Sequence, residues 1–400
     1  MIISDGTFLL VDYSKYFSLN NMGNINPKPV TGYRLLVSEP SMNDDTTGFL
    51  KNISEVWESR WMSNGGPKVL ELEEKLKTKY NIPNIAIVVN GTVALQSAIR
   101  ALNLPKGGNI ITTPFTWISS TSSILWEGYK PRFVDINPYT LNIDASKIEE
   151  AIDEETVAIL AVHVFSNPCE IEKIKTIANK HDLKIIYDAA HAVGVDYKGK
   201  DVSLYGDVSI HSYHATKVYN MGEGGSVIST NKNLMERVYN IRNCGLNSKK
   251  EIVRIGTNAK IHEVTACIGL ANLDIVDSSI KHRKDLYKKY FNSLSHLIGD
   301  GKLRLQKFKP EAYNYSYFPI ILESEKVLLE INEILKDNLI MARRYFHPTL
   351  NELKWGYNQS CPISEDISTR ILCLPSHDRV TSEDVKIISN IIDSVVNRED

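Results

Sequence analysis

The 400-residue sequence has little cysteine, no long apolar run and no excess of positive charge. Its 5 cysteines are scattered and form no CxxC pair, which argues against a disulfide framework and a structural zinc site, so we expect no metal. With 46 basic and 48 acidic residues, the basic surface typical of nucleic-acid binding is missing. No stretch approaches the roughly 18 apolar residues of a membrane span, and the start lacks a signal-peptide pattern. We therefore expect a cytoplasmic protein that binds neither nucleic acid nor membrane.

The length favours one large domain and one smaller domain, each with its own interior. Turn-forming Asn, Gly and Pro residues cluster before residue 30, and residues 1–59 are interpreted as an N-terminal extension or arm. In residues 60–280, short apolar runs alternate with helical patterns, which is typical of a mainly parallel sheet with helices on both faces. Residues 281–400 follow a charged helix near residue 280, and we predict a smaller α+β domain there.

The expected elements follow from hydrophobic periodicity and turn signals. In the large domain we predict strands at 85–89, 109–114, 132–136, 156–164, 184–190, 207–211 and 226–229, and helices at 69–80, 92–102, 119–128, 147–152 and 170–181. In the small domain we predict helices at 327–335 and 382–396, which alternate with the segments RLQKF (304–308), SYFPIIL (316–322) and RILCLP (370–375). This mixture is typical of an α+β domain.

Polar and aromatic side chains follow the first predicted strands, at the sheet edge where ligands bind in parallel α/β folds. Asn90, Gly91 and Thr92 open a helix whose free N–H groups suit a phosphate, although an ordinary strand–helix junction has the same pattern. Trp117 offers a ring that could stack on a flat heterocycle, with Phe115 as the second candidate. Core packing is the alternative for both rings.

An acid and a lysine follow two later strands. Asp188 ends one strand, and His191 comes three residues later. A carboxylate there needs a cation or a proton donor, which a protonated pyridine would supply, although Asp is also a common helix cap. Lys217 lies between two strands and is followed by the glycine-rich segment 222–225, which is typical of a reactive amine rather than a surface lysine. A helix start suited to a phosphate, an aromatic ring, a buried acid and a reactive lysine follow one another along the chain. Together they favour an enzyme that carries pyridoxal 5'-phosphate (PLP).

Several segments together make the chain similar to the DegT/DnrJ/StrS family of nucleotide-sugar aminotransferases, which are PLP enzymes of fold-type I. The segments that carry the resemblance are NGTVAL (90–95), TTPFTWISS (112–120), FVDI (133–136), YDAAHAVG (187–194), SYHATK (212–217), GEGGSV (222–227), RNCG (242–245), GTNAKIHEVTACIGL (256–270) and LCLPSHDRVTSEDV (372–385). The resemblance runs from about residue 61 to the C-terminal helix. It implies an α/β fold with a mainly parallel central sheet, helices on both faces and a smaller α+β C-terminal domain.

The resemblance also implies a role for each residue around the coenzyme ring. Lys217 would form the Schiff base with PLP. Asp188 would pair with the pyridine nitrogen. Trp117 would stack on the ring, and His191 would lie near its phenolic oxygen.

For the phosphate, the resemblance implies the backbone of Gly91 and Thr92 together with Ser212. Asn258 would reach the phosphate of a partner subunit, which implies a homodimer with shared active sites. Lys260 stands where the family segment usually has Arg. Lysine keeps the positive charge of arginine but lacks the planar guanidinium, which donates two parallel hydrogen bonds. A bidentate contact is therefore not expected at this position.

The implied reaction is ping-pong transfer of an amino group from L-glutamate to a nucleotide-linked keto-sugar, as in the biosynthesis of deoxyamino sugars and of lipopolysaccharide O-antigen. The segments WMSNGGP (61–67), SNPCE (166–170) and RRYFHP (343–348) favour dTDP-4-keto-6-deoxy-D-glucose as the acceptor, giving dTDP-4-amino-4,6-dideoxy-D-glucose. A 3-aminotransferase acting on a dTDP-3-keto-6-deoxy sugar and a 4-aminotransferase acting on a UDP-4-keto sugar remain alternatives.

Four further residues are assigned from their context. Arg343, Arg344 and Lys260 are candidate partners of the substrate diphosphate, with surface solvation as the alternative for each. His163 is interpreted as a structural residue that lines the site.

Three rival functions stay open at this point. A sugar 3-dehydratase of the same fold carries His in place of the Schiff-base lysine, and the presence of Lys217 argues against it. A ligand-sensing regulatory protein would need a basic DNA-binding segment, which residues before about 60 lack. A PLP reaction on an amino acid, such as that of a desulfurase or an aldolase, would act on no nucleotide sugar.

Overall fold

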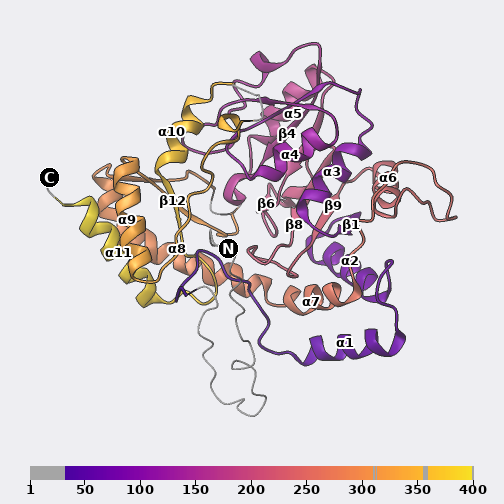
Figure 1. Ribbon diagram of the computed structural model, residues 1–400, viewed down its shortest axis with the longest axis horizontal. Coiled ribbons are helices and arrows are strands. Elements are labelled where there is room, and N and C mark those ends of the chain that lie inside the picture. The colour runs from indigo at the N-terminus through magenta and orange to yellow at the C-terminus, as the bar shows by residue number, and fades with distance from the viewer. Residues whose placement is uncertain (1–31, 310, 312, 355–358, 399–400) are drawn as a thin grey trace, which may run out of the picture.

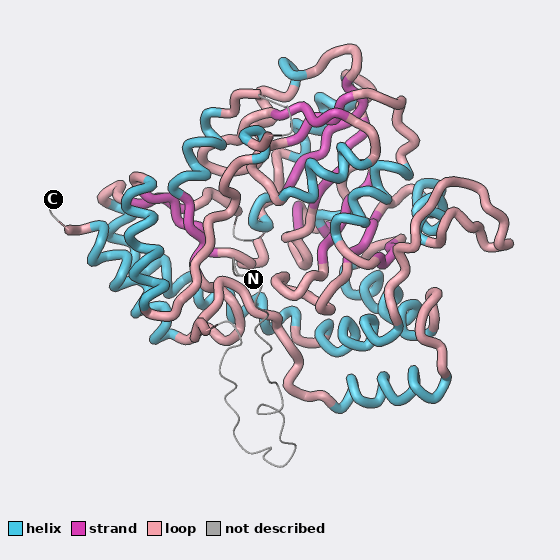
Figure 2. Tube along the Cα trace, in the orientation of Figure 1, coloured by secondary structure: helices cyan, strands magenta, loops and turns pink. Residues whose placement is uncertain are grey.

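The computed structural model describes residues 32–309, 311, 313–354 and 359–398. Most of the predicted N-terminal arm, residues 1–31, therefore lies outside the described residues. The described strands form a seven-stranded large sheet, a three-stranded small sheet and one two-stranded hairpin. The large and small sheets lie in separate parts of the molecule (Figures 1 and 2). The domain boundaries at residues 59/60 and 280/281 stay predictions.

The helices are numbered in chain order and labelled in Figure 1. They are α1 (Thr47–Ser59), α2 (Pro67–Tyr80), α3 (Gly91–Ala101), α4 (Ile118–Trp126), α5 (Ile171–Lys180), α6 (Lys232–Arg242), α7 (Glu263–Leu273), α8 (Val276–Gly299), α9 (Glu325–Asp337), α10 (Pro362–Arg370) and α11 (Ser382–Val396). Short 3-10 turns include η2 (Glu149–Ala151), η3 (Val164–Ser166), η4 (Val202–Leu204) and η6 (Leu350–Glu352).

The large sheet has the order β1-β9-β8-β5-β4-β2-β3. Its strands are β1 (Ile85–Val88), β2 (Asn109–Thr112), β3 (Lys130–Phe133), β4 (Thr156–Val162), β5 (Lys184–Asp188), β8 (Val208–Ser212) and β9 (Gly225–Ile228). β9 is antiparallel to both of its neighbours, whereas the pairs from β8 to β3 are parallel. The mainly parallel sheet expected from the alternation of strands and helices is confirmed. A separate hairpin joins β6 (Asp196–Tyr197) and β7 (Lys200–Asp201).

Alternate residues of these strands pack against different helices, as the two-residue period of a strand requires. Leu160 and Ile186 belong to the same apolar cluster as buried side chains of α3, α4 and α6. Ile159 and Ile185 belong to a second cluster, with α5. At β1, Ile87 packs with α2 and α7. Helices thus cover both faces of the large sheet. Asp188, two positions after Ile186 in β5, points to the same face as Ile186, where α3 and α4 pack.

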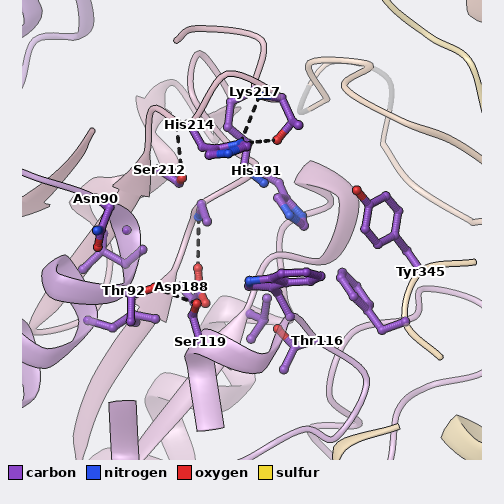
Figure 3. A pocket seen from close by; sticks show the side chains of 18 of the residues that line it. Asn90, Thr92, Thr116, Ser119, Asp188, His191, Ser212, His214, Lys217 and Tyr345 are labelled. Carbon is purple, nitrogen blue, oxygen red and sulfur yellow. Dashed lines mark hydrogen bonds between the residues drawn. The ribbon is translucent and has the colours of Figure 1, made fainter. Parts of the chain in front are cut away.

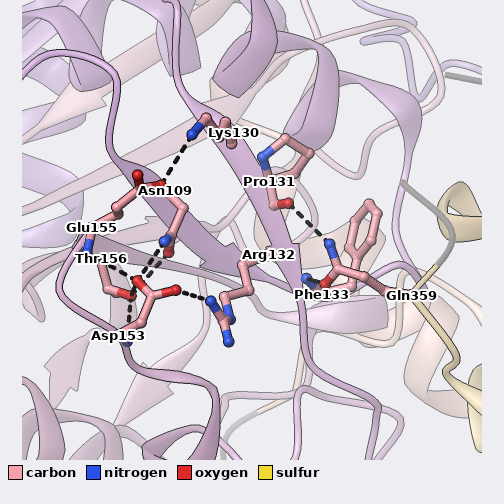
Figure 4. A network of polar contacts seen from close by, with 9 residues as sticks. All are labelled: Asn109, Lys130, Pro131, Arg132, Phe133, Asp153, Glu155, Thr156 and Gln359. Atoms are coloured by element: carbon pink, nitrogen blue, oxygen red, sulfur yellow. Dashed lines mark hydrogen bonds and ion pairs between the residues drawn. The ribbon is translucent and has the colours of Figure 1, made fainter. Parts of the chain in front are cut away.

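The outer edge of the large sheet is closed by a side chain. Along β3, the Gln359 carboxamide accepts from the Phe133 N–H at 2.8 Å and donates to the Pro131 carbonyl at 3.4 Å (Figure 4). The amide occupies the position of a neighbouring strand, so these backbone groups of the edge strand are not open to another chain. Arg132 of the same strand forms an ion pair with Asp153 (Figure 4).

The small sheet is antiparallel and has the order β10-β11-β12, with β10 (Leu303–Leu305), β11 (Phe318–Leu322) and β12 (Ile371–Leu374). Its core is shared with α8, α9 and α11. Leu35, from the predicted N-terminal arm, belongs to this core and forms a bridge to Ile340. Further along the same arm, α1 packs on α7 (Figure 1).

One predicted helix is wrong, and several helices were not predicted. The segment 147–152 forms only the 3-10 turn η2, because so few residues between two turns cannot repay the cost of starting an α-helix. Helix α7 was missed because its sequence, EVTACIGLANL, is apolar on almost every side and shows no clear helical stripe. Within the described ranges, no helix combines the length and the apolar character that crossing a bilayer requires.

Gly225→Ala should destabilise the fold at the junction of β9 and α3. A Cβ at this position would lie 2.6 Å from the carbonyl carbon of Asn90 and 2.8 Å from the Gly91 nitrogen, which are backbone atoms that cannot turn away. We expect the free energy of unfolding to fall by about 1–3 kcal/mol in urea titrations. Gly299→Ala, where nothing lies within 4 Å of the new atom, should be neutral or slightly stabilising. Equal stability of the two variants would contradict this packing.

Candidate active site

A cavity of about 310 Å³ lies at the carboxyl ends of the parallel strands of the large sheet. The predicted site residues that line it are Gly91, Thr92, Trp117, Asp188, His191, Ser212 and Lys217 (Figure 3). Tyr317, Arg343, Tyr345 and Phe346 also line it, and they come from the part of the chain that carries the small sheet. The cavity therefore lies between the two sheets.

Asp188 is the last residue of β5 and points to the side of α3 and α4. It is 4% exposed. Its carboxylate accepts from the Ser120 hydroxyl at 2.7 Å and from the Ala190 N–H at 3.1 Å. Burial raises the pKa of this carboxyl, against the opposing effect of these hydrogen bonds. The hydrogen bonds found for it come from neutral groups, and Lys217 acts on it only through its charge, so Asp188 is a buried acid suited to a cationic ligand group.

The N-terminus of α3 forms one end of the cavity. The Asn90 side chain caps the helix by accepting from the Val93 N–H at 2.9 Å. The first N–H groups of a helix have no partner within it, so those of Gly91 and Thr92 can bind an anion. Space at Gly91 is limited, because a Cβ there would lie 3.0 Å from the Cβ of Ser212, at the end of β8.

The two candidate stacking rings differ in their surroundings. Trp117 precedes α4, lines the cavity and is 48% exposed, so its ring is available to a ligand. Phe115 is fully buried and packs edge-on against Phe165 and Phe346. The placement therefore favours Trp117 over Phe115 for stacking.

His191 lies in the cavity wall after β5. Its Nδ1 accepts from the Phe165 N–H at 3.3 Å, which leaves Nε2 as the protonated nitrogen of the neutral ring. Burial, with a smaller contribution from the Lys217 charge, holds the pKa of His191 well below its usual range. The ring is therefore a neutral donor.

Lys217 lies in the loop between β8 and β9. Its amine donates to the hydroxyl of Tyr317 at 3.3 Å. Burial lowers the pKa of Lys217 to about 8, the Asp188 carboxylate opposes this, and the Arg343 guanidinium adds to it. An amine with such a pKa is partly neutral near physiological pH and can act as a nucleophile or a base.

Asn258 and Lys260 lie outside this cavity. Asn258 is exposed, and its backbone forms a bridge to Asn243. Lys260 lines a second depression of about 380 Å³ beside α6, and its amine is 4.0 Å from the Cys244 sulfur. Neither side chain serves the site of its own subunit, and a role in a partner's site stays a prediction.

Two sequence-based interpretations need correction. His163 is structural but does not line the cavity, because it belongs to the opposite face of the sheet, where it stacks on Tyr187 at 4.7 Å between ring centroids. Arg344 pairs with Glu325 at 2.6 Å and donates to the Thr369 carbonyl, so it is not free for a diphosphate. Its neighbour Arg343 does line the cavity, 5.6 Å from the Trp117 ring centroid.

Sequence reasoning missed three residues that shape the site. Ser120 binds Asp188, Tyr317 binds Lys217, and Tyr345 lines the cavity. Ser120 follows Trp117 within the same helix start and could have been found from its position. Tyr345 lies within the segment RRYFHP (343–348), but no role of its own was predicted for it. Tyr317 reaches the site only through the packing of the small sheet, and no local pattern in the sequence marks it.

These residues fit PLP on structural grounds. The buried Asp188 carboxylate lacks a cation that a protonated ring nitrogen would supply, and the first N–H groups of α3 suit its phosphate. Trp117 offers a ring, and Lys217 offers an amine with a lowered pKa. Across the described part of the chain, no group of His, Cys, Asp or Glu side chains is arranged to hold a metal ion.

Comparison with known proteins finds relatives over nearly the whole chain. The model of the DegT/DnrJ/EryC1/StrS aminotransferase family matches residues 43–393. A dTDP-4-amino-4,6-dideoxy-D-glucose transaminase of Shigella dysenteriae is 36% identical, over 90% of this chain and 98% of the relative. The structure of DesI in the presence of its TDP-sugar product aligns with a TM-score of 0.85 and 27% identity, over 91% of this chain and 93% of DesI. Ntda of Bacillus subtilis with bound cofactor PMP aligns with a TM-score of 0.83 and 25% identity, over 89% and 83%.

Lys217→Met should stabilise the cofactor-free protein below pH 8. The pKa of this lysine falls from 10.5 in the unfolded chain to about 8 in the fold, so below pH 8 the fold bears the full cost of a buried charge. We expect a gain in unfolding free energy of about 2 kcal/mol at pH 7, shrinking as the pH rises from 8 to 10.5. Urea titrations at several pH values measure it. A gain that does not change with pH would contradict the buried ammonium.

Proposed function

Because the chain belongs to the DegT/DnrJ/EryC1/StrS aminotransferase family, we propose that it transfers the amino group of L-glutamate to dTDP-4-keto-6-deoxy-D-glucose. The product is dTDP-4-amino-4,6-dideoxy-D-glucose. The chain is a PLP-dependent sugar aminotransferase. The observation that carries the proposal is the placement of Asp188 and Lys217 in one cavity beside a helix N-terminus. The choice of sugar is supported by the Shigella relative, which matches over nearly its whole length.

Asp188 and Lys217 divide the electrostatic and proton-transfer work. When bound, PLP supplies a protonated ring that withdraws electrons from the α-carbon of the amino donor. The Asp188 carboxylate holds the proton on the ring nitrogen, because a nearby anion favours the charged form. The Lys217 amine would take the proton from the α-carbon as a general base and then, as a general acid, deliver it to the C4' carbon of the coenzyme. Its pKa of about 8 allows both roles near neutral pH.

The remaining predicted residues bind and orient. His191 would donate its Nε2–H to the ring's phenolic oxygen, since its Nδ1 accepts from the Phe165 N–H. The N–H groups of Gly91 and Thr92 and the Ser212 hydroxyl, which line the cavity, would hold the phosphate.

Arg343 is the guanidinium best placed for the substrate's diphosphate. It lines the cavity and makes no ion pair with a carboxylate of the described residues. Its planar group lies over the rings of Trp117 and Tyr345, at 5.6 and 4.7 Å. These rings fix its orientation. The Tyr345 hydroxyl is also a hydrogen-bond partner of the guanidinium, whose other N–H groups can bind an oxyanion.

A homodimer with shared active sites is part of the proposal. The segment between α6 and α7 exposes Ile252 (80%) and Ile255 (78%) close to Asn258, and Trp57 of α1 is 77% exposed. Exposed apolar side chains of this size support a surface that another subunit covers. Asn258 would then reach the partner's phosphate site. The cytoplasmic location and a role in O-antigen synthesis stay predictions from the sequence.

The direct test is turnover with defined substrates. Purified protein with PLP, L-glutamate and dTDP-4-keto-6-deoxy-D-glucose should release 2-oxoglutarate and the amino sugar in equal amounts, measured by chromatography and mass spectrometry. Lys217→Ala should lower kcat by at least about a hundredfold, because it removes the general base.

The UDP-linked 4-keto sugar and the dTDP-linked 3-keto sugar serve as comparison substrates in the same assay, and we expect them to react more slowly. Full turnover by Lys217→Ala would contradict the mechanism. Reaction with a UDP-linked sugar alone would contradict the proposed acceptor.

A second prediction concerns the shared sites. Lys217→Ala and Asn258→Ala should each have low activity, while a mixture of the two, dissociated and reassociated, should regain up to about a quarter of the wild-type activity. In the mixed dimer, one of the two sites has both residues intact. Activity of mixed samples, with the mass by analytical ultracentrifugation, measures this. A monomeric wild type, or no recovery on mixing, would contradict the arrangement.

A further inference from the structure

The cavity lysine has a hydrogen-bond partner on the small sheet. Lys217 Nζ donates to the Tyr317 hydroxyl at 3.3 Å, and no other side-chain hydrogen bond of this amine is found among the described residues. Tyr317 directly precedes β11. The partner therefore comes from a part of the chain about 100 residues away from the lysine loop.

The position of the Tyr317 hydroxyl is fixed by packing. The ring is 7% exposed. It contacts the rings of Phe165 at 5.2 Å, His191 at 4.9 Å and Tyr345 at 5.7 Å between centroids. The Tyr313 hydroxyl donates to the Tyr317 carbonyl at 3.4 Å. A ring held on three sides keeps its hydroxyl at one place, so the contact with Lys217 is a property of the fold.

Charged and titratable groups from several elements act on the amine. Asp188 at the end of β5 favours the ammonium, and Arg343 disfavours it. His191 is neutral because burial lowers its pKa. On the lysine's own loop, His214 lies 3.6 Å from Glu223.

Tyr317 keeps its proton, because burial raises its pKa well above the usual value. A protonated phenol can accept from an ammonium and can donate to a neutral amine. It can therefore bind the lysine in both protonation states.

We propose that Tyr317 is a positioning residue that holds the free amine of Lys217 at one place during turnover and stabilises its ammonium form. This rests on the proposed function, in which the amine is free while the amino donor is bound. When the amine takes the proton from the α-carbon, the phenol oxygen accepts one N–H of the ammonium. When the ammonium gives this proton up to the C4' carbon of the coenzyme, the contact remains with the neutral amine. Tyr317 keeps its own proton throughout.

The test is the pKa of Lys217 in full-length, cofactor-free protein. Labelling with trace acetic anhydride across pH 6 to 11 reports the neutral fraction, read by mass spectrometry of the Lys217 peptide. In Tyr317→Phe, the apparent pKa should fall by about one unit, because the ammonium loses its hydrogen-bond acceptor while the ring packing stays. An unchanged pKa would overturn the proposal.

Tyr345→Phe is the matched control. It removes another phenol from the same cavity, one whose ring touches Tyr317 but whose hydroxyl makes no contact with Lys217. Its Lys217 pKa should stay within about 0.3 unit of the wild type, because an exchange without a direct contact changes little. Equal shifts in the two variants would mean a general change in polarity and would overturn the specific role.

Two further measurements separate this inference from the proposed function. In wild-type protein, the ¹³Cζ NMR signal of Tyr317 should shift with pH and show an inflection at the pKa of Lys217. This measurement uses only the wild type, so it tests the contact even if Tyr317→Phe does not fold. A signal that does not respond would overturn the inference. In loaded enzyme, the L-glutamate half-reaction should slow at least about tenfold in Tyr317→Phe. No reaction of the wild type with L-glutamate would overturn the proposed function, while the Lys217 titration would stand unaffected.

Discussion

The site depends on holding an acid and an amine in one buried cavity without letting them neutralise each other. Asp188 is buried at the end of β5, where its hydrogen bonds come from Ser120 and the Ala190 backbone and not from a cation. Lys217 is held on a separate loop by Tyr317. Burial raises the pKa of the acid and lowers that of the amine, so the charged form of each group is disfavoured in the cavity. A ligand that contacts these groups can relieve this cost. A bound coenzyme would relieve both costs, since its protonated ring nitrogen would pair with Asp188 and its aldehyde would take up the Lys217 amine.

The two sheets divide the work of building this cavity. The large sheet supplies the acid, the lysine and the phosphate end, because parallel strands bring their carboxyl ends to one edge. The part of the chain around the small sheet supplies Tyr317, Arg343 and Tyr345. The backbone of Arg343 is fixed by a bridge to Cys373 in β12. The orientation of the amine and of the guanidinium therefore depends on how the small sheet packs against the large one.

The sequence predicted the groups that act through local pattern and missed those that act through packing. Strand ends and glycines marked Gly91, Asp188 and Lys217, and the family resemblance supplied their roles. The period-two alternation, applied to β4, would have placed His163 on the face away from the site. Tyr317 could not be found, because its contact joins two segments about 100 residues apart and follows from tertiary packing alone. The segment 147–152 was predicted as a helix from its apolar spacing, but it is too short for an α-helix and forms only the turn η2.

The central claim is that Lys217 is the amine that binds the coenzyme covalently. The most direct measurement is borohydride reduction of the PLP-loaded protein, followed by proteolysis and mass spectrometry. The account predicts that the reduced coenzyme is found on the peptide that contains Lys217, in about one copy per chain. A label on another lysine, or none after loading with PLP, would contradict it.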